Sequence, residues 1–547
     1  MVMTQNKISK VITGSAILVT LIITPWLNVD SMVIPKLIIL SFTAFLLLPE
    51  AFKFIVSNLR KTSLSINILQ ITVGLILIQM TLVLIITEAP FEQQFFGKTG
   101  RGLGYISYFS LLVLVLISSR IFNTINIKVI SQGLFFSSLI SGMYSILQFY
   151  GLDIFSWSSR TNGIIGTIGN PNFQSSFSGI AILSSVLYYS SKEIIRKILG
   201  LGHSLVLLYA IYLCQSWQGY ALVVLSLALL FGYYLRLKKV LLFRLFSFFM
   251  LGTGTVVALG VLNIGPFSQI LFKYSMRSRT EMWRSSIRTI KDNPGFGIGL
   301  DSFGDYSLYY KDPMDISGVN EFTDNSHNYY LEFATTGGIV LLALNLALIV
   351  LTLYSFTKIL RQKDNFDFIL ISLFSAWVCF IAQSLISPAT LPILTWNYII
   401  SGAVIGLASN DQQIKFLNNQ NSNKRLLDGL ASKTIFLTVI IVIMYPYFNV
   451  DRLYLQASRT GNGVLAIEVA QMYPESVLRY QRIGRELLES KLYDQALEVA
   501  KAASKFNPNS FSAWALIYVN PVTPAVDKEK AYIELTRVYP LNPELQP

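Results

Sequence analysis

The residues most able to do chemistry lie in a short polar stretch, DNSHNYYLEF at 324–333, which contains one of the chain's two histidines. His327 stands beside Asn325 and Asn328, just before a long apolar segment. A histidine can take up a proton near neutral pH, which suits a general base acting on a hydroxyl. The alternative is an interfacial histidine hydrogen-bonded to backbone. The polar neighbours favour the functional interpretation, because they could orient the ring and, in the case of Asn328, hold an acceptor.

A group of basic residues precedes this stretch. The segment 273–291 has six Lys or Arg residues against one Glu. On a helix, Arg277 and Arg284 would share one face, while Arg279 would share another with Trp283. Further basic side chains occur in two shorter polar segments, namely Lys98, Arg101 and Arg160. Arginine presents a planar fork of donors that suits phosphate oxygens, so these residues could bind a lipid pyrophosphate. Charge alone favours the alternative, in which they contact anionic headgroups or acidic residues.

Other candidate motifs indicate structural roles. The glycine-rich stretch NPGFGIGLDSFGDY at 293–306 lacks the pattern of a phosphate-binding loop and favours a turn. The aspartates around it are scattered, so we expect neither a metal nor a cofactor. Cys214, Cys379 and the second histidine, His203, lie in apolar runs. We expect them to pack as part of the interior and not to form a disulfide or a metal site.

The amino-acid composition indicates what kind of structural elements position these residues. Only 13% of the 547 residues are charged and 53% are hydrophobic, with a mean hydropathy of +0.53. Soluble domains carry about 25% charged residues, so a single water-soluble core is excluded. Long apolar runs recur and predict an all-α polytopic membrane protein. The net charge of +13 is then explained by basic cytoplasmic loops, not by nucleic-acid binding.

We predict about 13 transmembrane helices, and the first is expected to be an uncleaved span and not a signal peptide. Short loops rich in Lys and Arg alternate along the chain, so the N-terminus is expected inside and the C-terminus outside. Residues 1–449 would form the membrane domain, with a large extracytoplasmic loop at 264–337. The predicted spans are 11–28, 37–56, 64–86, 103–119, 129–149, 173–190, 198–216, 219–235, 240–263, 338–356, 368–387, 391–408 and 434–449.

The tail, residues 450–547, has the composition of a soluble domain and contains an internal repeat. Pro474 and Pro508 are 34 positions apart, as are Tyr480 and Trp514. A 34-residue period is typical of tetratricopeptide units, in which paired helices stack through small residues. We therefore predict a small extracytoplasmic helical domain. Residues 455–547 could bind a protein partner or could serve as a structural cap.

Several of these motifs together resemble a known family. The order RSRTEMW, NPGFGIGLDSFGDY and DNSHNYYLEFATTGGIVLLAL is similar to that of the O-antigen ligase and polymerase superfamily of bacterial envelope glycosyltransferases. The stretches FFGKTGRGLGYISY and RTNGIIGTIGNPNFQSS resemble earlier loops of the same family. The resemblance covers most of residues 90–400. A tetratricopeptide tail also occurs in some relatives.

The resemblance implies a GT-C-like fold in the bacterial cytoplasmic membrane, with the site at its outer face. The donor would be a glycan on undecaprenyl pyrophosphate. The acceptor would be a hydroxyl of lipid A core in a ligase, of a growing glycan in a polymerase, or of a protein in an O-oligosaccharyltransferase. His327 matches the catalytic histidine and Arg279 the arginine that precedes the tryptophan. Lys98, Arg101 and Arg160 lie where the family places further positive charge. We expect metal-independent transfer with inversion.

One position departs from the family pattern. Gln218 stands where relatives often carry an arginine, so the donor contact at this position is open. A rival interpretation from another class is a transporter, such as a flippase for lipid-linked glycans. Transporters of that kind place charges near the middle of the bilayer and often show repeated halves. Here the charges lie in outer loops and no matching halves are visible, which favours the transferase.

Overall fold

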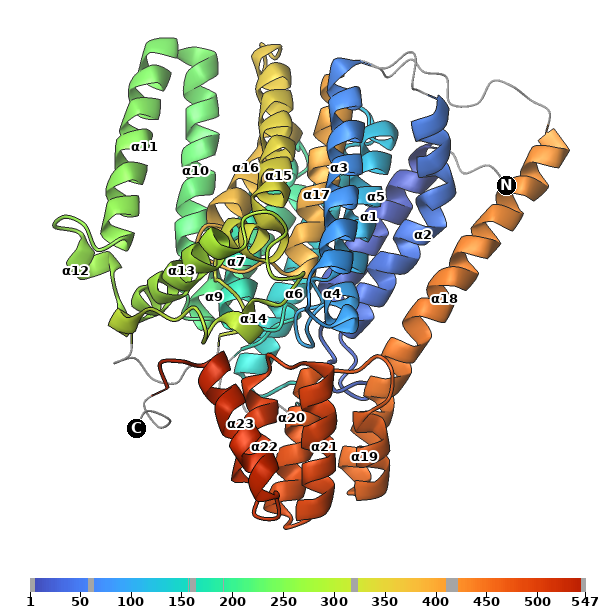
Figure 1. The fold of residues 1–547 in the computed structure, drawn as a ribbon. Helices are drawn as coiled ribbons and strands as arrows, with labels where there is room; N and C mark the ends of the chain where they lie inside the picture. The colour runs from blue at the N-terminus through green and yellow to red at the C-terminus, as the bar shows by residue number, and fades with distance from the viewer. Residues whose placement is uncertain are drawn as a thin grey trace.

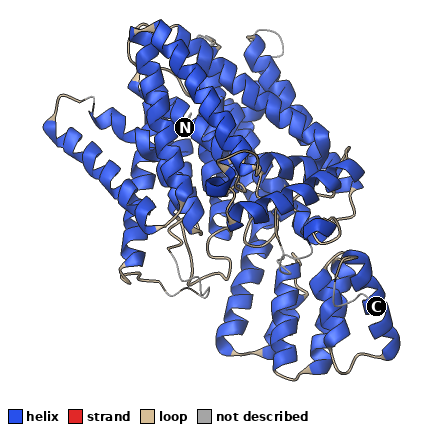
Figure 2. Ribbon diagram, turned by 90° about the vertical axis from the view of Figure 1, so that its left-hand side faces the viewer, coloured by secondary structure: helices blue, strands red, loops and turns tan. Residues whose placement is uncertain are grey.

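The computed structural model describes residues 5–57, 63–155, 157, 164–189, 191–315, 323–409 and 422–542, and these residues form helices and loops without a strand. The helices divide into a large bundle and a smaller group at one end of it (Figure 1). Figure 2 shows the same all-helical architecture from the side. The all-α polytopic fold predicted from the sequence is therefore confirmed.

The bundle contains a helix at each of the thirteen predicted spans. Nine helices in the described part of the chain are long and apolar enough to cross a membrane, and Tyr105–Ile121 and Phe368–Gln383 are shorter apolar helices. The helices of the bundle are α1 (Gln5–Leu21), α2 (Ile34–Ser57), α3 (Leu64–Ile86), α5 (Tyr105–Ile121), α6 (Lys128–Phe149), α7 (Pro171–Ala181), α8 (Val186–Tyr189), α9 (Ile194–Leu213), α10 (Trp217–Lys238), α11 (Val240–Val261), α15 (Tyr329–Arg361), α16 (Phe368–Gln383), α17 (Leu391–Ala408) and α18 (Ser422–Thr460).

The centre of the bundle is the contact between α5 and α17. Almost every residue of both helices is buried, in agreement with their near-continuous apolar sequences. Gly402 of α17 permits a close approach, because a Cβ there would lie 2.2 Å from the carbonyl oxygen of Val115. By contrast, α11 has only Gly260 buried. It stands beside α10 at the edge of the bundle (Figure 1), where its apolar side chains would face lipid.

The two ends of the bundle carry different elements. The turn between α10 and α11 and the C-terminal end of α15 lie at one end, and Arg236 of α10 donates a 2.6 Å hydrogen bond to the carbonyl oxygen of Leu360 there. The opposite end carries the short helices α4 (Phe91–Phe96), α12 (Ser268–Leu271) and α14 (Phe303–Tyr306), together with the longer α13 (Tyr274–Asp292). The sequence segments predicted to lie on one side of the membrane, 87–102 and the described part of 264–337, therefore gather at one end.

Five C-terminal helices lie beyond this same end, and the last four form two antiparallel pairs. The five are α19 (Gly463–Ala470), α20 (Val477–Glu489), α21 (Tyr493–Phe506), α22 (Phe511–Val519) and α23 (Ala525–Val538). The pairs α20/α21 and α22/α23 begin 34 residues apart, at Val477 and Phe511. Tyr480, whose spacing from Trp514 predicted the repeat, is buried among these helices, as are the small residues Ala496 and Ala500. The tetratricopeptide assignment itself remains a prediction.

The C-terminal helices are joined to the bundle by covalent and polar contacts. Helix α18 runs unbroken to Thr460, so the predicted boundary at 449/450 falls inside it. The side-chain hydroxyls of Thr99 and Ser476 are 2.8 Å apart. Asn507 donates a 3.0 Å hydrogen bond to the Asp305 carboxylate. These contacts place the C-terminal helices directly against the segments that carry Lys98 and the glycine-rich stretch.

Candidate functional site

A break in α15 separates the candidate site from the rest of the membrane helix. Gly338 has φ +81° and ψ 170°, which interrupts the helical path. A Cβ at this position would lie 2.0 Å from the carbonyl oxygen of Gly295, so only glycine fits. The glycine-rich stretch packs into the break, and the backbone N–H of Ile339 donates to the carbonyl oxygen of Pro294 at 2.8 Å. The stretch is thus a structural turn, as expected, that supports a short helix, residues 329–337.

His327 lies in the tight turn just before this short helix. Its φ is +48°, a left-handed conformation that is unusual for a residue with a side chain. The turn is held by its neighbours: the His327 backbone N–H donates to the Asn325 side chain at 2.8 Å. The Asn328 side chain caps the helix by accepting hydrogen bonds from the backbone N–H groups of Tyr330 and Leu331. Asn328 is therefore a structural cap in this structure, next to the candidate base.

A carboxylate fixes the other side of the turn. Both the backbone N–H and the hydroxyl of Ser326 donate to the Glu332 carboxylate, each at 2.8 Å. The second oxygen of Glu332 lies 3.5 Å from the Arg101 guanidinium. Because Glu332 is only 9% exposed, these contacts are shielded from solvent and hold the turn firmly. The positions before and after His327 are thus each fixed by a side chain.

The imidazole of His327 is poised as a neutral base. Its Nδ1 is buried without a hydrogen-bond partner among the described residues. Burial lowers the pKa of His327 to about 4, and the positive charges of Arg279 and Arg101 add to this effect, while Asp324 opposes it. The ring is therefore unprotonated at neutral pH and has a nitrogen available to accept a proton.

Arg279 reaches the same region from α13. Its Nε donates to the carbonyl oxygen of Ile386 at 2.8 Å, and its Nη1 donates to that of Ser275 at 2.8 Å. No carboxylate of the described residues lies within ion-pair distance of Arg279. Burial lowers the pKa of this guanidinium. It is thus a partly buried cation held by carbonyl oxygens, and none of the described acidic residues forms an ion pair with it.

Four consecutive residues between α16 and α17 connect the candidate residues. The carbonyl oxygens of Ser384, Leu385 and Ile386 accept hydrogen bonds from the Tyr329 backbone, the Asn328 side chain and Arg279 respectively. The hydroxyl of Ser387 then donates to the side-chain oxygen of Gln218 at 3.0 Å. Sequence reasoning missed this segment, because backbone carbonyls leave no signal in residue identity. It brings together Gln218, Arg279 and the His327 turn from three distant parts of the chain.

Gln218 lies in the first turn of α10 and is fixed through its carbonyl end. The hydroxyls of Ser176 and Ser387 both donate to its Oε1, each at 3.0 Å. The amide –NH2 is therefore the end that could donate to a ligand. The structure places this uncharged side chain within the group of candidate residues, at the position where the family pattern has an arginine.

Lys98 and Arg101 are compensated by carboxylates. The Lys98 Nζ lies 3.1 Å from Asp324, and its backbone N–H donates to Asp301 at 2.8 Å. The Arg101 Nε lies 3.3 Å from Asp301. Burial would lower the pKa of both cations, but the neighbouring carboxylates outweigh it and raise both pKa values. These two residues support the His327 turn, and their acidic partners, Glu332 included, were not identified from the sequence.

The remaining predicted cations lie away from this group or outside the described residues. Arg284 pairs bidentately with Asp315, which is buried. Arg277 lies 3.4 Å from Glu281 on the surface of α13. These pairs correspond to the alternative stated above, in which the arginines contact acidic residues. Arg160 lies outside the described residues.

The second histidine and the cysteines have the packing roles expected of them. His203 is 1% exposed, stacks on Phe135 at 4.2 Å and lies 2.9 Å from the Ser138 hydroxyl. Cys214 and Cys379 are buried and unpaired with each other. A buried lysine was missed: Lys36 of α2 is 2% exposed and donates to the carbonyl oxygens of Ile22 and Thr167. It ties the ends of α1 and α2 to the segment before α7.

The fold and this group of residues define a class: a polytopic, all-helical membrane protein with a half-buried histidine and an arginine at one end of the bundle, the arginine having no carboxylate partner among the described residues. Comparison with family models makes the assignment more specific. Residues 179–346 match the family described as O-antigen ligase, and this range contains Gln218, Arg279 and His327. This match supports the resemblance to the O-antigen ligase and polymerase superfamily that the sequence motifs indicated. A comparison with curated proteins gave no match.

Proposed function

We propose that the protein transfers a glycan from undecaprenyl pyrophosphate to an acceptor hydroxyl at the outer face of a bacterial cytoplasmic membrane. The observation that carries this proposal is the pairing of a neutral imidazole, which has an unpartnered nitrogen, with Arg279, which has no carboxylate partner among the described residues. The family match supports a membrane glycosyltransferase of ligase or polymerase type. Ligase, polymerase and protein transferase share this chemistry and differ in the acceptor.

In the proposed reaction, the acceptor oxygen attacks the anomeric carbon of the donor glycan. The bond between that carbon and the phosphate oxygen breaks, and its electron pair leaves with the lipid pyrophosphate. His327 takes the proton of the acceptor hydroxyl, and a single displacement inverts the anomeric carbon. Arg279 supplies charge to the leaving group, so the protein's main contributions are positioning and electrostatic stabilisation.

Donor binding would strengthen the base. The pKa of His327 is low because the ring is buried and because Arg279 and Arg101 are positively charged. A pyrophosphate bound to Arg279 adds negative charge beside the ring, which favours the protonated imidazole and so raises its pKa. The general base would then become effective only when the donor is in place. This coupling would limit unproductive proton transfer in the absence of donor.

The proposed orientation has the N-terminus in the cytoplasm and the C-terminal helices outside. The gathering of α4, α13, α14 and the C-terminal helices at one end, with the α10–α11 turn and its Arg236, Lys238 and Lys239 at the other, supports it. In this orientation His327 and Arg279 lie on the outer side, where a lipid-linked glycan is presented after it has crossed the membrane. The C-terminal helices would then be available to an extracytoplasmic protein partner.

The proposal is tested by transfer from a purified lipid-linked glycan in proteoliposomes without an energy source. His327→Gln should lower transfer by about 10²–10⁴-fold, the usual contribution of a general base. His203→Gln is the matched control, because it makes the same chemical change at the histidine that packs inside the bundle. Transfer by His327→Gln at the control's level would refute the role of His327. Glycan movement across the bilayer without a covalent product would favour the flippase instead.

A further inference from the structure

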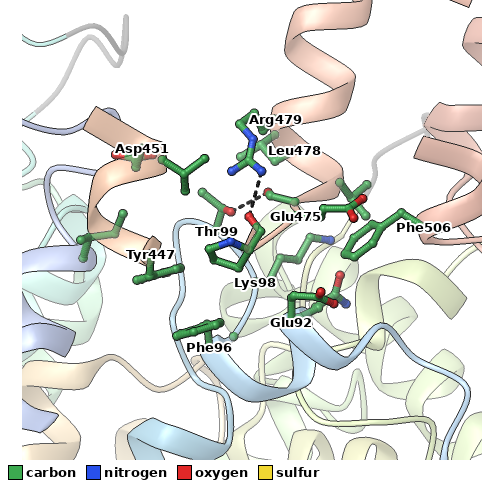
Figure 3. A pocket seen from close by; sticks show the side chains of 17 residues that line it. Glu92, Phe96, Lys98, Thr99, Tyr447, Asp451, Glu475, Leu478, Arg479 and Phe506 are labelled. Atoms are coloured by element: carbon green, nitrogen blue, oxygen red, sulfur yellow. Dashed lines mark hydrogen bonds between the residues drawn. The ribbon is translucent and has the colours of Figure 1, made fainter. Parts of the chain in front are cut away.

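A pocket lies where the C-terminal helices meet the membrane bundle, and the function proposed above does not use it (Figure 3). Most of its lining comes from three parts of the chain, namely residues 92–99 around α4, residues 447–451 of α18 and residues 474–479 at the start of α20, and Ile34 and Phe506 complete it. Its volume is about 40 Å³. One ordered water needs roughly 10–15 Å³, so the space admits a small polar substituent but not a complete sugar ring.

Two buried polar groups at this pocket lack a hydrogen-bond partner within the described ranges. Tyr447 is 8% exposed and stacks on Phe96, with ring centroids 4.7 Å apart and planes inclined by 3°. This stacking fixes the phenol, yet its hydroxyl has no hydrogen-bond partner among the described residues. Arg479 is 7% exposed and donates through Nη2 to the carbonyl oxygens of Met472 and Pro474, while its Nε meets no acceptor in the described part of the chain. Buried groups of this kind are normally satisfied, which indicates a ligand or ordered water.

The charges around the pocket select for a neutral polar ligand. Lys98 and Arg479 supply positive charge, and Glu92, Asp451 and Glu475 supply negative charge. An anion would meet the carboxylates and a cation would meet the two basic groups. A group that both donates and accepts hydrogen bonds, and that also has an apolar face, fits the mixture of polar and aromatic lining. Hydroxyl and acetamido substituents of sugars have this character.

The pocket is connected to the candidate site through Lys98. Figure 3 shows the Lys98 side chain among the labelled residues of the pocket. Its Nζ lies 3.1 Å from Asp324, three positions before His327, and its backbone N–H is bonded to Asp301. The Thr99 and Ser476 hydroxyls, both in the pocket lining, link the membrane bundle to the C-terminal helices there. A glycan in the pocket would therefore be close to the group that carries the candidate base.

We propose that this interdomain pocket binds a hydroxyl or acetamido substituent of a saccharide substrate, with the Tyr447 hydroxyl and the Arg479 Nε as its fixed polar contacts. The inference rests on the proposed function, since that function supplies a saccharide as ligand. The glycan of the donor and a glycan acceptor share this chemistry. The pocket would give the C-terminal helices a direct part in selecting the glycan.

The first test measures binding of free sugars to the purified full chain in nanodiscs. The probes are N-acetylglucosamine and glucose, observed by saturation-transfer difference NMR. Tyr447→Phe removes only the hydroxyl and should weaken binding about fivefold, as expected for the loss of one hydrogen bond. Tyr454→Phe is the matched control, because it makes the same change in α18 at a buried residue outside the pocket. The control should bind as the wild type does.

A second variant tests the pocket by filling it. Leu478→Trp places a larger side chain at its lining and should abolish the sugar signal. Leu492→Trp makes the same change at an exposed position of the C-terminal helices, outside the pocket, and should leave the signal unchanged. The proposal is overturned if neither sugar gives a signal with the wild type. It is also overturned if Tyr447→Phe and Leu478→Trp bind both sugars normally, as for a cavity that holds only water.

Transfer kinetics distinguish the two possible sources of the glycan. If the pocket takes the donor glycan, Tyr447→Phe should raise KM for the lipid-linked donor about fivefold. If it takes an acceptor glycan, the rise should occur in KM for the acceptor. An unchanged KM for both substrates would contradict a role in substrate selection. Sugar binding is measured without transfer, so it does not depend on the role of His327. The pocket should therefore bind sugars in His327→Gln, and also if the proposed role of His327 is wrong.

Discussion

Replacement of Arg279 by methionine should affect both the rate of transfer and its dependence on pH. The guanidinium is held by two carbonyl oxygens and faces no carboxylate among the described residues, so in the proposed reaction its charge would be available to the leaving pyrophosphate. It is also one of the two cations that lower the pKa of His327. A neutral side chain of similar length removes both effects while preserving much of the packing.

The magnitudes of the two effects can be worked out separately. Loss of one well-aimed charged donor costs about 3 kcal/mol, or about a hundredfold in rate. The fall in the pKa of His327 from 6.5 to about 4 corresponds to about 3 kcal/mol, shared between burial, Arg279 and Arg101. Burial is the largest cause, so without Arg279 the pKa should rise above 4 and stay below 6.5. Activity requires the unprotonated ring, so the acid limb of the pH profile should move to higher pH.

The assay is kcat/KM for transfer in proteoliposomes, measured from about pH 4 to pH 8, because this quantity reports the ionisation of the free enzyme. Near pH 8 the Arg279→Met variant should show only the hundredfold loss, whereas near pH 5 its loss should be larger. Arg279→Lys retains the charge, so its acid limb should stay where the wild type has it, although the rate falls. Lys291→Met, at an exposed position of α13, is the control for removal of a basic residue from that helix. Wild-type kcat/KM in Arg279→Met, or an acid limb that does not move, would refute the reasoning.

Two further predictions concern the supports of the His327 turn. Gly338→Ala should destabilise the protein by well over 1 kcal/mol, because φ is +81° and the new Cβ would collide with the Gly295 carbonyl oxygen. The melting temperature of this variant in detergent should fall. The control Gly252→Ala, in open space on α11, should leave the melting temperature unchanged. Glu332→Gln should lower stability by about 1–3 kcal/mol and also reduce kcat, since it leaves Arg101 with less negative charge beside it and alters the hydrogen bonds to Ser326. A normal melting temperature with normal kcat would contradict the second prediction.

The sequence by itself determined the membrane helices and the candidate chemistry. A helix in lipid satisfies its backbone hydrogen bonds within its own segment, so an apolar run of sufficient length predicts a span without knowledge of its neighbours. The helices found at 64–86 and 391–408 coincide with the predicted spans for this reason. His327 and Arg279 were likewise recognisable from residue type, charge and surrounding motif.

Only the tertiary structure decided which charges remain available at the site. Arg101 and Asp301 are 200 positions apart in sequence, and Arg284 and Asp315 are 31 apart, so no local pattern indicates that they pair. The same is true of the carbonyl oxygen of Ile386, which holds Arg279, and of the pocket at Tyr447. Charge compensation depends on distance in space, which the packing of remote helices sets. The sequence thus supplied a list of cations, and the fold left Arg279 beside His327 without a carboxylate partner in the described chain.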